Sequence, residues 1–593
     1  TCALPICSPG IFIPKEPTSH ILKEAENGNF GLFALFSGQG SAFLEELSDL
    51  YLTYPFVRRL IKSGIDAYRE EMQSGKAMKE TLRFVSQGFD VLKWISDPAS
   101  APDAEYLLGF VVSGPLILLT QIAHVLVACR SLRISPSQLA RAFKGATGHS
   151  QGIFSALLLS VVKDEEDLIA LTQKFMKVFF WLTIRCQAAN PRISISPEVL
   201  RTAMEDQAGF PSPLLAVSRI SRTVLDRCVE DVNNTLPTER YNKVVLQNSP
   251  DTFVVSGQPF CLEKLRLALQ ERCARPGVDQ TRIPFSKRKP KGRASYLSVS
   301  VAFHNAVVLS ECLPIILDDI KHIEINITSA DLQVPVYNNW NGDNLQDCDP
   351  SVALIPLLIE SITSKTVNWC SAVQHMHRTA GITHAVDFGI GGLAGTAKMT
   401  LAFMDGHGVQ YISACSYASD QHRGILSKGY FFDSRPERLK PTESWYKLYA
   451  PNVLRSSEGE LKLENRLTRL LGRPPVLTAG MTPTTASPEI VAAIANAGYH
   501  AELAGGGQNT PAKFRATVEE IVRNLIPGCG FSVNIMYLNA RQWSFQFDLA
   551  QKLRLEGLPI ESVTVAAGVP SPEKSDDIVR ACRHSGMRFI SFK

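Results

Sequence analysis

The chain has 593 residues, of which 45% are hydrophobic and 20% charged, a composition typical of globular domains with large cores. Its 61 basic and 57 acidic side chains leave a net charge of +4, too balanced to indicate a nucleic-acid partner. The 13 cysteines include no Cys-x-x-Cys pair, so we expect reduced thiols in a cytoplasmic protein and no metal site. The dense basic run at 287–293 is expected to be a solvated loop, or alternatively a site that attracts phosphate groups of a ligand.

The first third of the chain predicts a leader followed by an α/β arrangement. Residues 1–30 carry four prolines and are interpreted as a leader of uncertain order, and residues 31–36 then form a buried strand. Helical spacing of apolar residues follows within 44–73. The most apolar stretch, 107–128, contains Pro115, Gln121 and His124, so we expect a buried helix there and not a membrane span.

Residues 145–152 hold the pattern around which this region is organised. Gly148-His149-Ser150-Gln151-Gly152 stands between a predicted strand and an apolar run at 153–159, and Gly-x-Ser-x-Gly in that position is the pattern of a nucleophile elbow. The glycines permit a sharp turn that leaves Ser150 at the start of a helix. There the backbone N–H of Gln151 can hold an oxyanion.

Further along, the order of predicted strands and helices is informative in two more regions. The order strand, helix, strand, strand, helix between about 210 and 290 predicts a ferredoxin-like insert. After a polar linker at 426–470, strand–helix units of about 25–30 residues fill 471–593, which predicts a parallel sheet, either doubly wound or a (β/α)8 barrel. Only five strands are predicted and the chain stops directly after the fifth, so we expect a truncated barrel and a fragment of a longer protein.

A serine nucleophile requires a base and a second oxyanion donor. Among the 12 histidines, His149 is expected to point away from Ser150, whereas His304 stands at the end of a strand-like run and is the candidate base. The backbone of Gln39, in a glycine-flanked turn, is the candidate second donor. The elbow alone also fits an α/β-hydrolase such as a lipase or thioesterase.

The order of motifs then becomes specific. The chain carries, in sequence, Gly38-Gln39-Gly40-Ser41, Gly145 to Gly152, Asn248-Ser249-Pro250, Val255-Ser256-Gly257, Arg282 to Ser286, Phe303-His304 and Asp387-Phe388-Gly389. This series resembles the starter acyltransferase (acetyltransferase) domain of the β subunit of fungal type I fatty acid synthases, some relatives of which make short acids for secondary metabolites. The fold that the resemblance implies is an α/β acyltransferase with a ferredoxin-like insert over 31–425.

The resemblance implies a role for each matching residue. Ser150 would carry the acyl group, His304 would be the general base, and the backbone N–H groups of Gln39 and Gln151 would form the oxyanion hole. Asn248 is expected beside His304. Because the family uses a Ser–His dyad oriented by backbone carbonyls, we interpret Asp387 as a strand-end cap and not as a triad acid.

Selectivity and partners are also expectations from the resemblance. Leu182 occupies the position where malonyl-specific relatives place an arginine, which favours acetyl or another short neutral acyl group, with Trp181 beside it and Arg185 as a competing carboxylate clamp. The implied partners are acetyl-CoA or a short acyl-CoA and an acyl carrier protein on an α subunit, in a large hetero-oligomer. The alternative is a non-catalytic assembly fragment of such a subunit.

The second region is similar to the start of the FMN-dependent enoyl reductase barrel of the same subunit. The motifs are Leu471 to Pro475, Ala479 to Thr485, Asn496 to Tyr499 and Glu502 to Gly507. The residues expected to face FMN are Gly480, Met481, Thr482, Gly505, Gly506, Asn534 and Lys593. Because the family's flavin phosphate loop and catalytic histidine are expected beyond Lys593, we expect no enoyl reduction by this chain and doubtful FMN binding.

Overall fold

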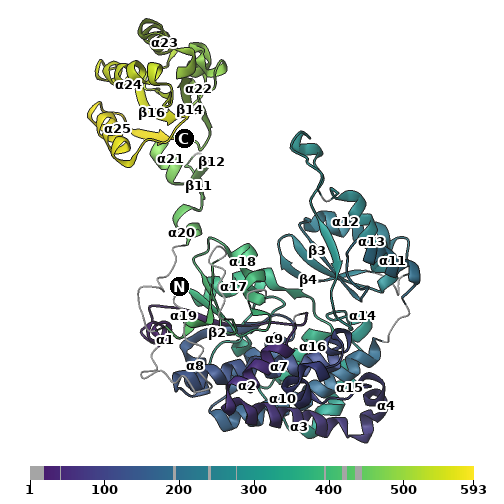
Figure 1. The fold of residues 1–593 in the computed structure, drawn as a ribbon. Coiled ribbons are helices and arrows are strands. Elements are labelled where there is room, and N and C mark those ends of the chain that lie inside the picture. The colour runs from purple at the N-terminus through teal and green to yellow at the C-terminus, as the bar shows by residue number, and fades with distance from the viewer. Residues whose placement is uncertain are drawn as a thin grey trace. The chain divides into compact units, whose positions relative to one another are not determined.

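The computed structural model describes residues 19–40, 42–190, 195–237, 242–275, 277–392, 395–416, 424–433, 444–457 and 459–593 (Figure 1). The chain divides into two compact units, Thr1–Ser444 and Trp445–Lys593. Of the predicted leader, residues 1–18 lie outside the described part. Its remainder differs from the prediction, because helix α1 (His20–Glu26) buries Ile21 and Leu22 in the core of the first unit.

The first unit is built on a five-stranded parallel sheet. Its strand order is β10-β9-β8-β1-β2, with β1 at Leu32–Phe36, β2 at Phe143–Gly148, β8 at His384–Asp387, β9 at Gln410–Ser413 and β10 at Ile425–Leu426. All five residues of β1 are buried. An all-parallel sheet covered on both faces requires such continuous apolar strands, and the prediction of a buried strand here is confirmed.

Helices cover this sheet. They are α2 (Leu44–Thr53), α3 (Arg58–Met72), α4 (Met78–Phe84), α5 (Val91–Ser96), α6 (Ala104–Leu108), α7 (Phe110–Leu132), α8 (Pro136–Ala142), α9 (Gly152–Val161), α10 (Glu165–Ala189), α14 (Ala306–Leu309), α15 (Cys312–Asp319), α16 (Leu354–Thr363), α17 (Trp369–Ala380), α18 (Thr396–Met404) and α19 (Lys428–Phe431). Among the described residues, α7 is the one helix long and apolar enough to cross a membrane, and its most apolar window is 100% buried in the core, as expected.

The predicted insert is present. Its strands are β3 (Leu214–Ser218), β4 (Lys243–Ser249), β5 (Thr252–Ser256) and β6 (Arg293–Tyr296), and its helices are α11 (Pro197–Glu205), α12 (Arg222–Asn233) and α13 (Pro259–Arg272). The antiparallel order β6-β3-β5-β4 is that of a ferredoxin-like sheet. Strand β7 (Val367–Asn368) lies outside the insert in sequence and pairs in parallel with β4. It thereby joins the sheet of the insert to the rest of the first unit.

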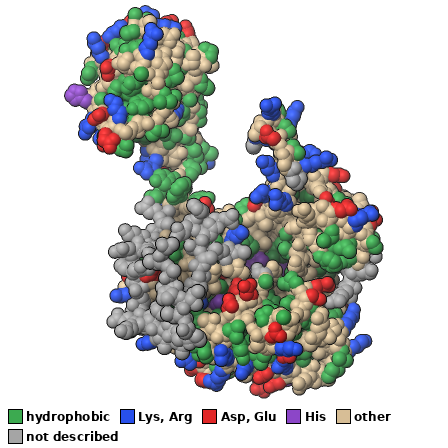
Figure 2. All heavy atoms as spheres, viewed as in Figure 1, with side chains coloured by type: hydrophobic (Ala, Val, Ile, Leu, Met, Phe, Trp, Pro, Cys, Tyr) green, Lys and Arg blue, Asp and Glu red, His purple; other side chains and the backbone are tan. Residues whose placement is uncertain are grey.

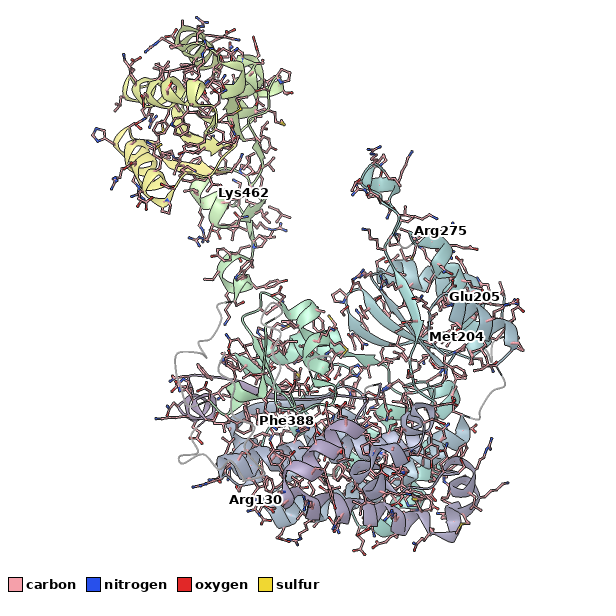
Figure 3. The ribbon with its side chains drawn as sticks, in the orientation of Figure 1. Arg130, Met204, Glu205, Arg275, Phe388 and Lys462 are labelled. Atoms are coloured by element: carbon pink, nitrogen blue, oxygen red, sulfur yellow. The ribbon has the colours of Figure 1, made fainter. Side chains whose placement is uncertain are left out.

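A basic segment projects from the insert between α13 and β6. Figure 3 labels Arg275 at its base, and Figure 2 shows Lys and Arg side chains gathered along it. Lys287, Arg288, Lys289 and Lys291 are exposed. Arg288 donates to the carbonyls of Ile283 and Thr281, so part of this charge serves to hold the loop itself. The run is thus a solvated loop.

The second unit opens with structure that the sequence did not predict. Within the expected linker, described residues form α20 (Trp445–Tyr449), an antiparallel hairpin of β11 (Asn452–Arg455) and β12 (Leu461–Glu464), and α21 (Arg466–Leu471). Most residues of the hairpin strands are exposed, including the apolar Val453, Leu454, Leu461 and Leu463, and each strand is only four residues long. Residues 417–423 and 434–443 of the irregular region lie outside the described part.

Five parallel strands follow in sequential order, β13-β14-β15-β16-β17. They span Leu477–Thr478, His500–Ala504, Phe531–Met536, Ile560–Ala566 and Phe589–Phe592, and alternate with α22 (Pro488–Asn496), α23 (Pro511–Asn524), α24 (Ala540–Leu555) and α25 (Pro572–His584). A doubly wound sheet reverses its strand order at a switch point, whereas a barrel adds each strand beside the previous one. The second unit is therefore a curled half-barrel, and the prediction of a partial barrel is confirmed.

Candidate active site

Ser150 lies on a tight elbow between β2 and α9. Its φ of 50° is the left-handed conformation that such an elbow imposes. The flanking glycines are required by close approach, because a Cβ on Gly148 would lie 1.9 Å from the carbonyl carbon of Gly152, and one on Gly152 would lie 2.4 Å from the backbone oxygen of Phe36. The predicted role of both glycines is therefore confirmed by the packing.

The structure brings His304 to Ser150 across 154 residues of sequence. The distance from Ser150 Oγ to His304 Nε2 is 2.8 Å. Nδ1 of His304 lies 2.8 Å from the carbonyl oxygen of Ser361 and 3.0 Å from that of Lys365. Since carbonyls only accept hydrogen bonds, Nδ1 carries the proton and Nε2 is left as the acceptor for the serine hydroxyl. The orientation by backbone carbonyls is the one that the family resemblance implies.

The charge state of His304 follows from its burial. The side chain is almost fully buried, which lowers its pKa to about 4 even though the hydrogen bonds from Nδ1 oppose that shift. The neighbouring His149 lowers the pKa further. At neutral pH the imidazole is therefore uncharged, as a base that must accept a proton from Ser150 requires.

Two glutamines line the approach to Ser150. Gln39 Nε2 donates to Gln151 Oε1 at 2.8 Å, and Gln39 Oε1 accepts from Ser113 Oγ at 3.0 Å. A Cβ on Gly38 would lie 3.1 Å from Ser150 Cβ, so the turn that carries Gln39 packs directly against the elbow. Within the described part of the chain, the backbone N–H groups of Gln39 and Gln151 both lack a hydrogen-bond acceptor. Both are free to receive an oxyanion.

Two buried side chains that the sequence analysis missed hold this geometry. Asn339 Nδ2 donates to the carbonyls of Gly148 and Ser150, each at 3.0 Å. Gln121 Nε2 donates to the carbonyls of Ser37 (2.8 Å) and Gly389 (2.6 Å), which fixes the turn after β1. The one signal for Asn339 was an asparagine-rich turn at 338–342, and nothing in the sequence linked that turn to the elbow.

Asn248, expected beside His304, is hydrogen-bonded to the neighbouring histidine. Its Oδ1 accepts a hydrogen bond from His149 Nε2 at 3.0 Å. The His149 ring also packs edge-on against Trp369, at 5.4 Å between ring centroids. Both nitrogens of His304 are already occupied. Asn248 therefore acts on the elbow through His149.

Asp387 takes no part in the pair. It ends β8, where its carboxylate accepts the backbone N–H groups of Gly389 (3.0 Å) and Ala397 (2.7 Å). Burial raises its pKa to about 7, against the lowering effect of those hydrogen bonds. Among the described residues no carboxylate bonds to His304, so the site is a Ser–His dyad, unlike the acid-containing triad of an α/β-hydrolase.

The predicted selectivity residues lie in the core formed by α10. Leu182 is fully buried, and Trp181 donates from Nε1 to Glu71 Oε2 at 2.7 Å. Arg185 pairs with Asp319 at 2.6 Å and with Glu80 at 3.0 Å. Trp181 is thus anchored to α3, and no described contact joins it to Ser150. Arg185 is already neutralised, which removes the argument for it as a carboxylate clamp.

In the second unit, the residues expected at FMN converge on Glu502, which the sequence analysis named without a role. Its buried carboxylate accepts from Gly480 N (2.8 Å), Asn534 Nδ2 (2.9 Å), Thr564 Oγ1 (2.8 Å) and Lys593 Nζ (2.9 Å). Burial alone would raise the pKa of Glu502, but these four donors hold it below its usual value.

The remaining predicted flavin residues form the rim of this cluster. A Cβ on Gly505 would lie 2.5 Å from the backbone oxygen of Asn534, and one on Gly506 would lie 2.6 Å from Thr482 Oγ1, so the turn after β14 needs glycine at both positions. Met481 is 48% exposed. The strand ends therefore hold the expected set together, and Asn534 and Lys593 each keep N–H hydrogens beyond those bonded to Glu502.

Comparison with known proteins agrees with this site. Residues 34–290 match the family described as starter unit:ACP transacylase in aflatoxin biosynthesis. Over these residues, which include Ser150 and end before His304, the first unit is similar to acyl-carrier-protein transacylases.

Two curated fungal proteins are similar to almost the whole chain. The chain is 33% identical over 98% of its length to the fatty acid synthase subunit beta of Saccharomyces cerevisiae, and 33% identical over 98% to the fatty acid synthase beta subunit TOXC of Cochliobolus carbonum. It spans 28% of the length of each. The chain is thus a homologue of the fungal fatty acid synthase β subunits, as the motif series predicted.

Solved structures show a weaker similarity to part of the chain. A malonyl-transacylase in complex with its type II polyketide synthase acyl-carrier protein is 19% identical, with a TM-score of 0.45 over 65% of this chain and 95% of that one. A malonyl CoA-acyl carrier protein transacylase of Clostridium perfringens is 20% identical, with a TM-score of 0.44 over 64% and 92%.

Proposed function

We propose that the first unit transfers an acetyl or other short neutral acyl group from an acyl-CoA, through an ester on Ser150, to the phosphopantetheine thiol of an acyl carrier protein. The observation that carries this proposal is the 2.8 Å contact between Ser150 Oγ and an uncharged, carbonyl-oriented His304. The backbone N–H groups of Gln39 and Gln151, for which the described residues offer no acceptor, supply the two oxyanion donors that acyl transfer requires.

In the first half-reaction Ser150 Oγ attacks the thioester carbonyl while His304 Nε2 takes the hydroxyl proton. The carbonyl oxygen becomes an oxyanion that the N–H groups of Gln39 and Gln151 stabilise, a contribution for which one donor is typically worth ~10²–10³ in rate. The tetrahedral intermediate then collapses. Coenzyme A leaves as the thiol with the proton from His304, and Ser150 keeps the acyl group.

The second half-reaction reverses these roles. The carrier thiol gives its proton to His304 and attacks the acyl-serine, and the same two N–H groups hold the second oxyanion. His304 returns the proton to Ser150 Oγ as the ester breaks. Neither half-reaction requires a carboxylate beside the imidazole, because the carbonyls of Ser361 and Lys365 already fix its tautomer.

The preference for a neutral acyl group rests on the charges near α10. The apolar Leu182 has no group that could bind a carboxylate, and Arg185 already forms ion pairs with Asp319 and Glu80. A free malonyl carboxylate would therefore lose its hydration without gaining a partner. Starter acyl groups without a charge do not have that cost.

The wider setting is part of the same proposal. The chain would act in a large cytoplasmic hetero-oligomer whose α subunit carries the acyl carrier protein. FMN supplies hydride transfer when it is bound to a complete barrel. In such a barrel FMN would be held by Gly480, Met481, Thr482, Gly505, Gly506, Asn534 and Lys593. Asn534 and Lys593 fit that role because Glu502 fixes their positions while leaving N–H donors free.

The test is intact-mass spectrometry after brief exposure of the full chain to acetyl-CoA, hexanoyl-CoA or malonyl-CoA. We expect one acyl adduct from a neutral donor, its transfer to a holo acyl carrier protein, and none with Ser150→Ala. Discharge to water in place of the carrier would indicate a hydrolase. Absence of any adduct on a folded chain would contradict the proposal and favour an assembly role.

A further inference from the structure

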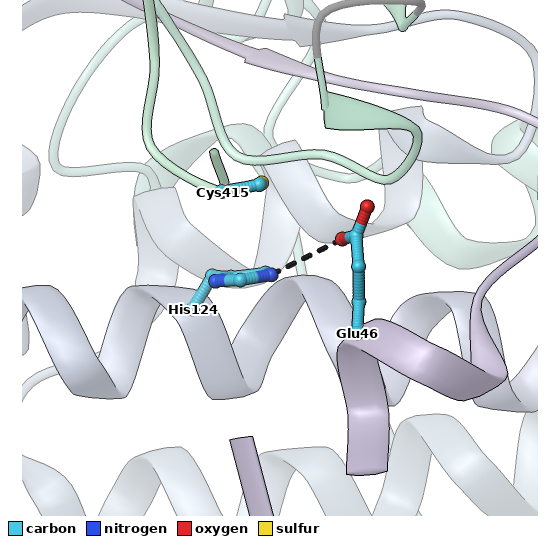
Figure 4. Close-up of side chains that lie close together, drawn as sticks. All are labelled: Glu46, His124 and Cys415. Atoms are coloured by element: carbon cyan, nitrogen blue, oxygen red, sulfur yellow. Dashed lines mark hydrogen bonds and ion pairs between the residues drawn. The ribbon is translucent and has the colours of Figure 1, made fainter. Parts of the chain in front are cut away.

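A second cluster of chemically active side chains lies behind the oxyanion turn of the first unit. Glu46 from the first turn of α2, His124 from the middle of α7 and Cys415 from the loop after β9 converge there (Figure 4). One potential ligand atom from each residue lies within 4.8 Å of the other two. The dyad and the oxyanion hole use none of them.

The spacing of two of these atoms already matches a metal site. His124 Nε2 and Glu46 Oε2 are 3.3 Å apart. Two ligands held at about 2.0–2.1 Å from a tetrahedral zinc ion are separated by roughly 3.3 Å, and a thiolate ligand at about 2.3 Å lies only slightly farther from each. The 4.8 Å limit that holds all three atoms exceeds these separations by little more than about 1 Å, so the cluster needs only a modest contraction to hold the ion.

The histidine lacks what a purely structural role would give it. Only 5% of the His124 surface is exposed. Its one hydrogen bond among the described residues is nevertheless the long contact to Glu46. Its Nδ1 has no partner in the described part of the chain. A buried imidazole is normally hydrogen-bonded at both nitrogens, so hydrogen bonding within the described part of the chain holds this ring only weakly. A metal bond at Nε2 would replace the long contact to Glu46 with a strong bond, and Nδ1 would keep its present surroundings.

We propose that Glu46, His124 and Cys415 form a zinc site, with water as the fourth ligand. The donor set of one thiolate, one imidazole and one carboxylate suits Zn²⁺ better than Mg²⁺ or Ca²⁺, which prefer oxygen ligands. On binding, the Cys415 thiol releases its proton to solvent. The thiolate and the Glu46 carboxylate then balance the two charges of the ion.

This site would act on the oxyanion turn through the backbone. Glu46 Oε1 accepts the N–H of Gly391 at 2.9 Å, and the carbonyl of Gly389 accepts the N–H of Ser37 at 2.8 Å. A Cβ on Gly389 would lie 2.4 Å from Cys415 Sγ, so the sulfur packs directly on this loop. Ser37 precedes Gly38 and Gln39. A bound ion would thus brace the turn that supplies one oxyanion donor.

The sequence analysis expected no metal site because the three ligands are separated by 78 residues and more and lack a ligand motif. The inference does not depend on the proposed acyl transfer. A chain that binds no metal can still acylate Ser150, and a chain that binds zinc can fail to do so, so the two proposals fail separately.

The experiment uses Co²⁺ as the spectroscopic probe on the full chain, after removal of metals with a chelator. We expect a thiolate-to-cobalt charge-transfer band that saturates at one Co²⁺ per chain and is displaced by Zn²⁺. The band should vanish in Cys415→Ser and remain in Cys348→Ser, a part-buried cysteine outside the cluster. Glu46→Gln should keep the band but weaken cobalt affinity by about tenfold or more.

Either of two results would overturn the site. The first is absence of the band in the folded wild-type chain, with folding checked by acylation of Ser150 or by circular dichroism. The second is a band that persists in Cys415→Ser. If that variant does not fold, Cys415→Ala gives the same decision, because it also removes the thiol on which the band depends.

Discussion

Both units gather polar side chains at the carboxyl ends of parallel strands, beside glycine-rich turns, but they treat those side chains differently. In the first unit Ser150 and His304 bond to each other, and two nearby N–H groups have no acceptor among the described residues. In the second unit Glu502 accepts four hydrogen bonds, two on each oxygen. The first cluster therefore has hydrogen-bond donors without acceptors, whereas in the second cluster the hydrogen-bonding capacity of the Glu502 carboxylate is filled.

This difference separates a reactive site from a brace. A buried group with unfilled bonding capacity is costly, and folded proteins keep such groups mainly where a ligand or transition state will complete them. A fully satisfied buried network stabilises the fold and fixes its neighbours. We therefore expect changes in the first cluster to abolish chemistry, and changes at Glu502 to cost stability.

The strongest test of the reactive half is Ser150→Ala. It should abolish the acyl adduct entirely, because the ester has no other nucleophile in the dyad, while His304→Ala should slow acylation by about 10²–10⁴. Rapid-quench mass spectrometry measures both. The matched control is Ser160→Ala, a buried serine of α9 whose hydroxyl bonds to the carbonyl of Val334. An adduct that survives in Ser150→Ala would move the reactive site elsewhere.

Gly148→Ala tests whether the elbow is held by packing. The new Cβ would meet the backbone of Gly152 at 1.9 Å, and backbone cannot move aside as a side chain can. We expect the first unit to lose about 3 kcal/mol or more of unfolding free energy, measured by chemical denaturation. Gly75→Ala, where nothing lies within 4 Å of the new Cβ, is the control. Equal stability of the two variants would refute the packing argument.

Some features of the two units could be predicted from the sequence and others could not. The elbow, the strand order of the insert and the sequential strands of the half-barrel follow from local patterns, since glycine spacing and apolar runs specify them directly. The pairing of Ser150 with His304 was available only through the resemblance to a family. No local pattern encodes a contact between residues 154 positions apart.

The misses have the same physical origin. Asn339 and Glu502 act through buried hydrogen bonds to distant backbone and side chains, and a single polar residue in a sequence does not reveal such partners. The hydrogen bond between Asn248 and His149 was missed because it joins residues 99 positions apart, and the His149 ring that makes it also packs against the distant Trp369. The hairpin at 452–464 was missed because its two strands are only four residues long and their residues are mostly exposed, so the pattern is too short to stand out from the polar region around it.

Glu502→Gln tests the second cluster. The amide keeps the shape but removes the charge that pairs with Lys593, and it turns an N–H₂ group toward donors. We expect a loss of about 1–3 kcal/mol in the second unit and unchanged acylation in the first. Glu519→Gln, on the exposed face of α23, is the control. A stable Glu502→Gln variant would show that the network does not brace the strands.

The pH dependence of stability gives the same test without a substitution. The pKa of Glu502 is lowered in the folded state, so its stabilising contribution is complete above the usual glutamate pKa and is lost as pH falls through the folded value. The wild-type second unit should therefore weaken in acid more than Glu502→Gln does. Parallel denaturation curves at neutral and acidic pH measure that difference.

The smallest expected effect, and the most specific one, is the pH profile of acylation. His304 must be neutral to accept the proton of Ser150, and its pKa is lowered to about 4 by burial. Single-turnover acylation at pH 5 should therefore keep about nine-tenths of its rate at pH 7, whereas a histidine with the ordinary pKa would keep only a few per cent. A decline centred near pH 6.5 would mean that water reaches the imidazole. In that case the first cluster would not be the dry, incomplete site that distinguishes it from the second.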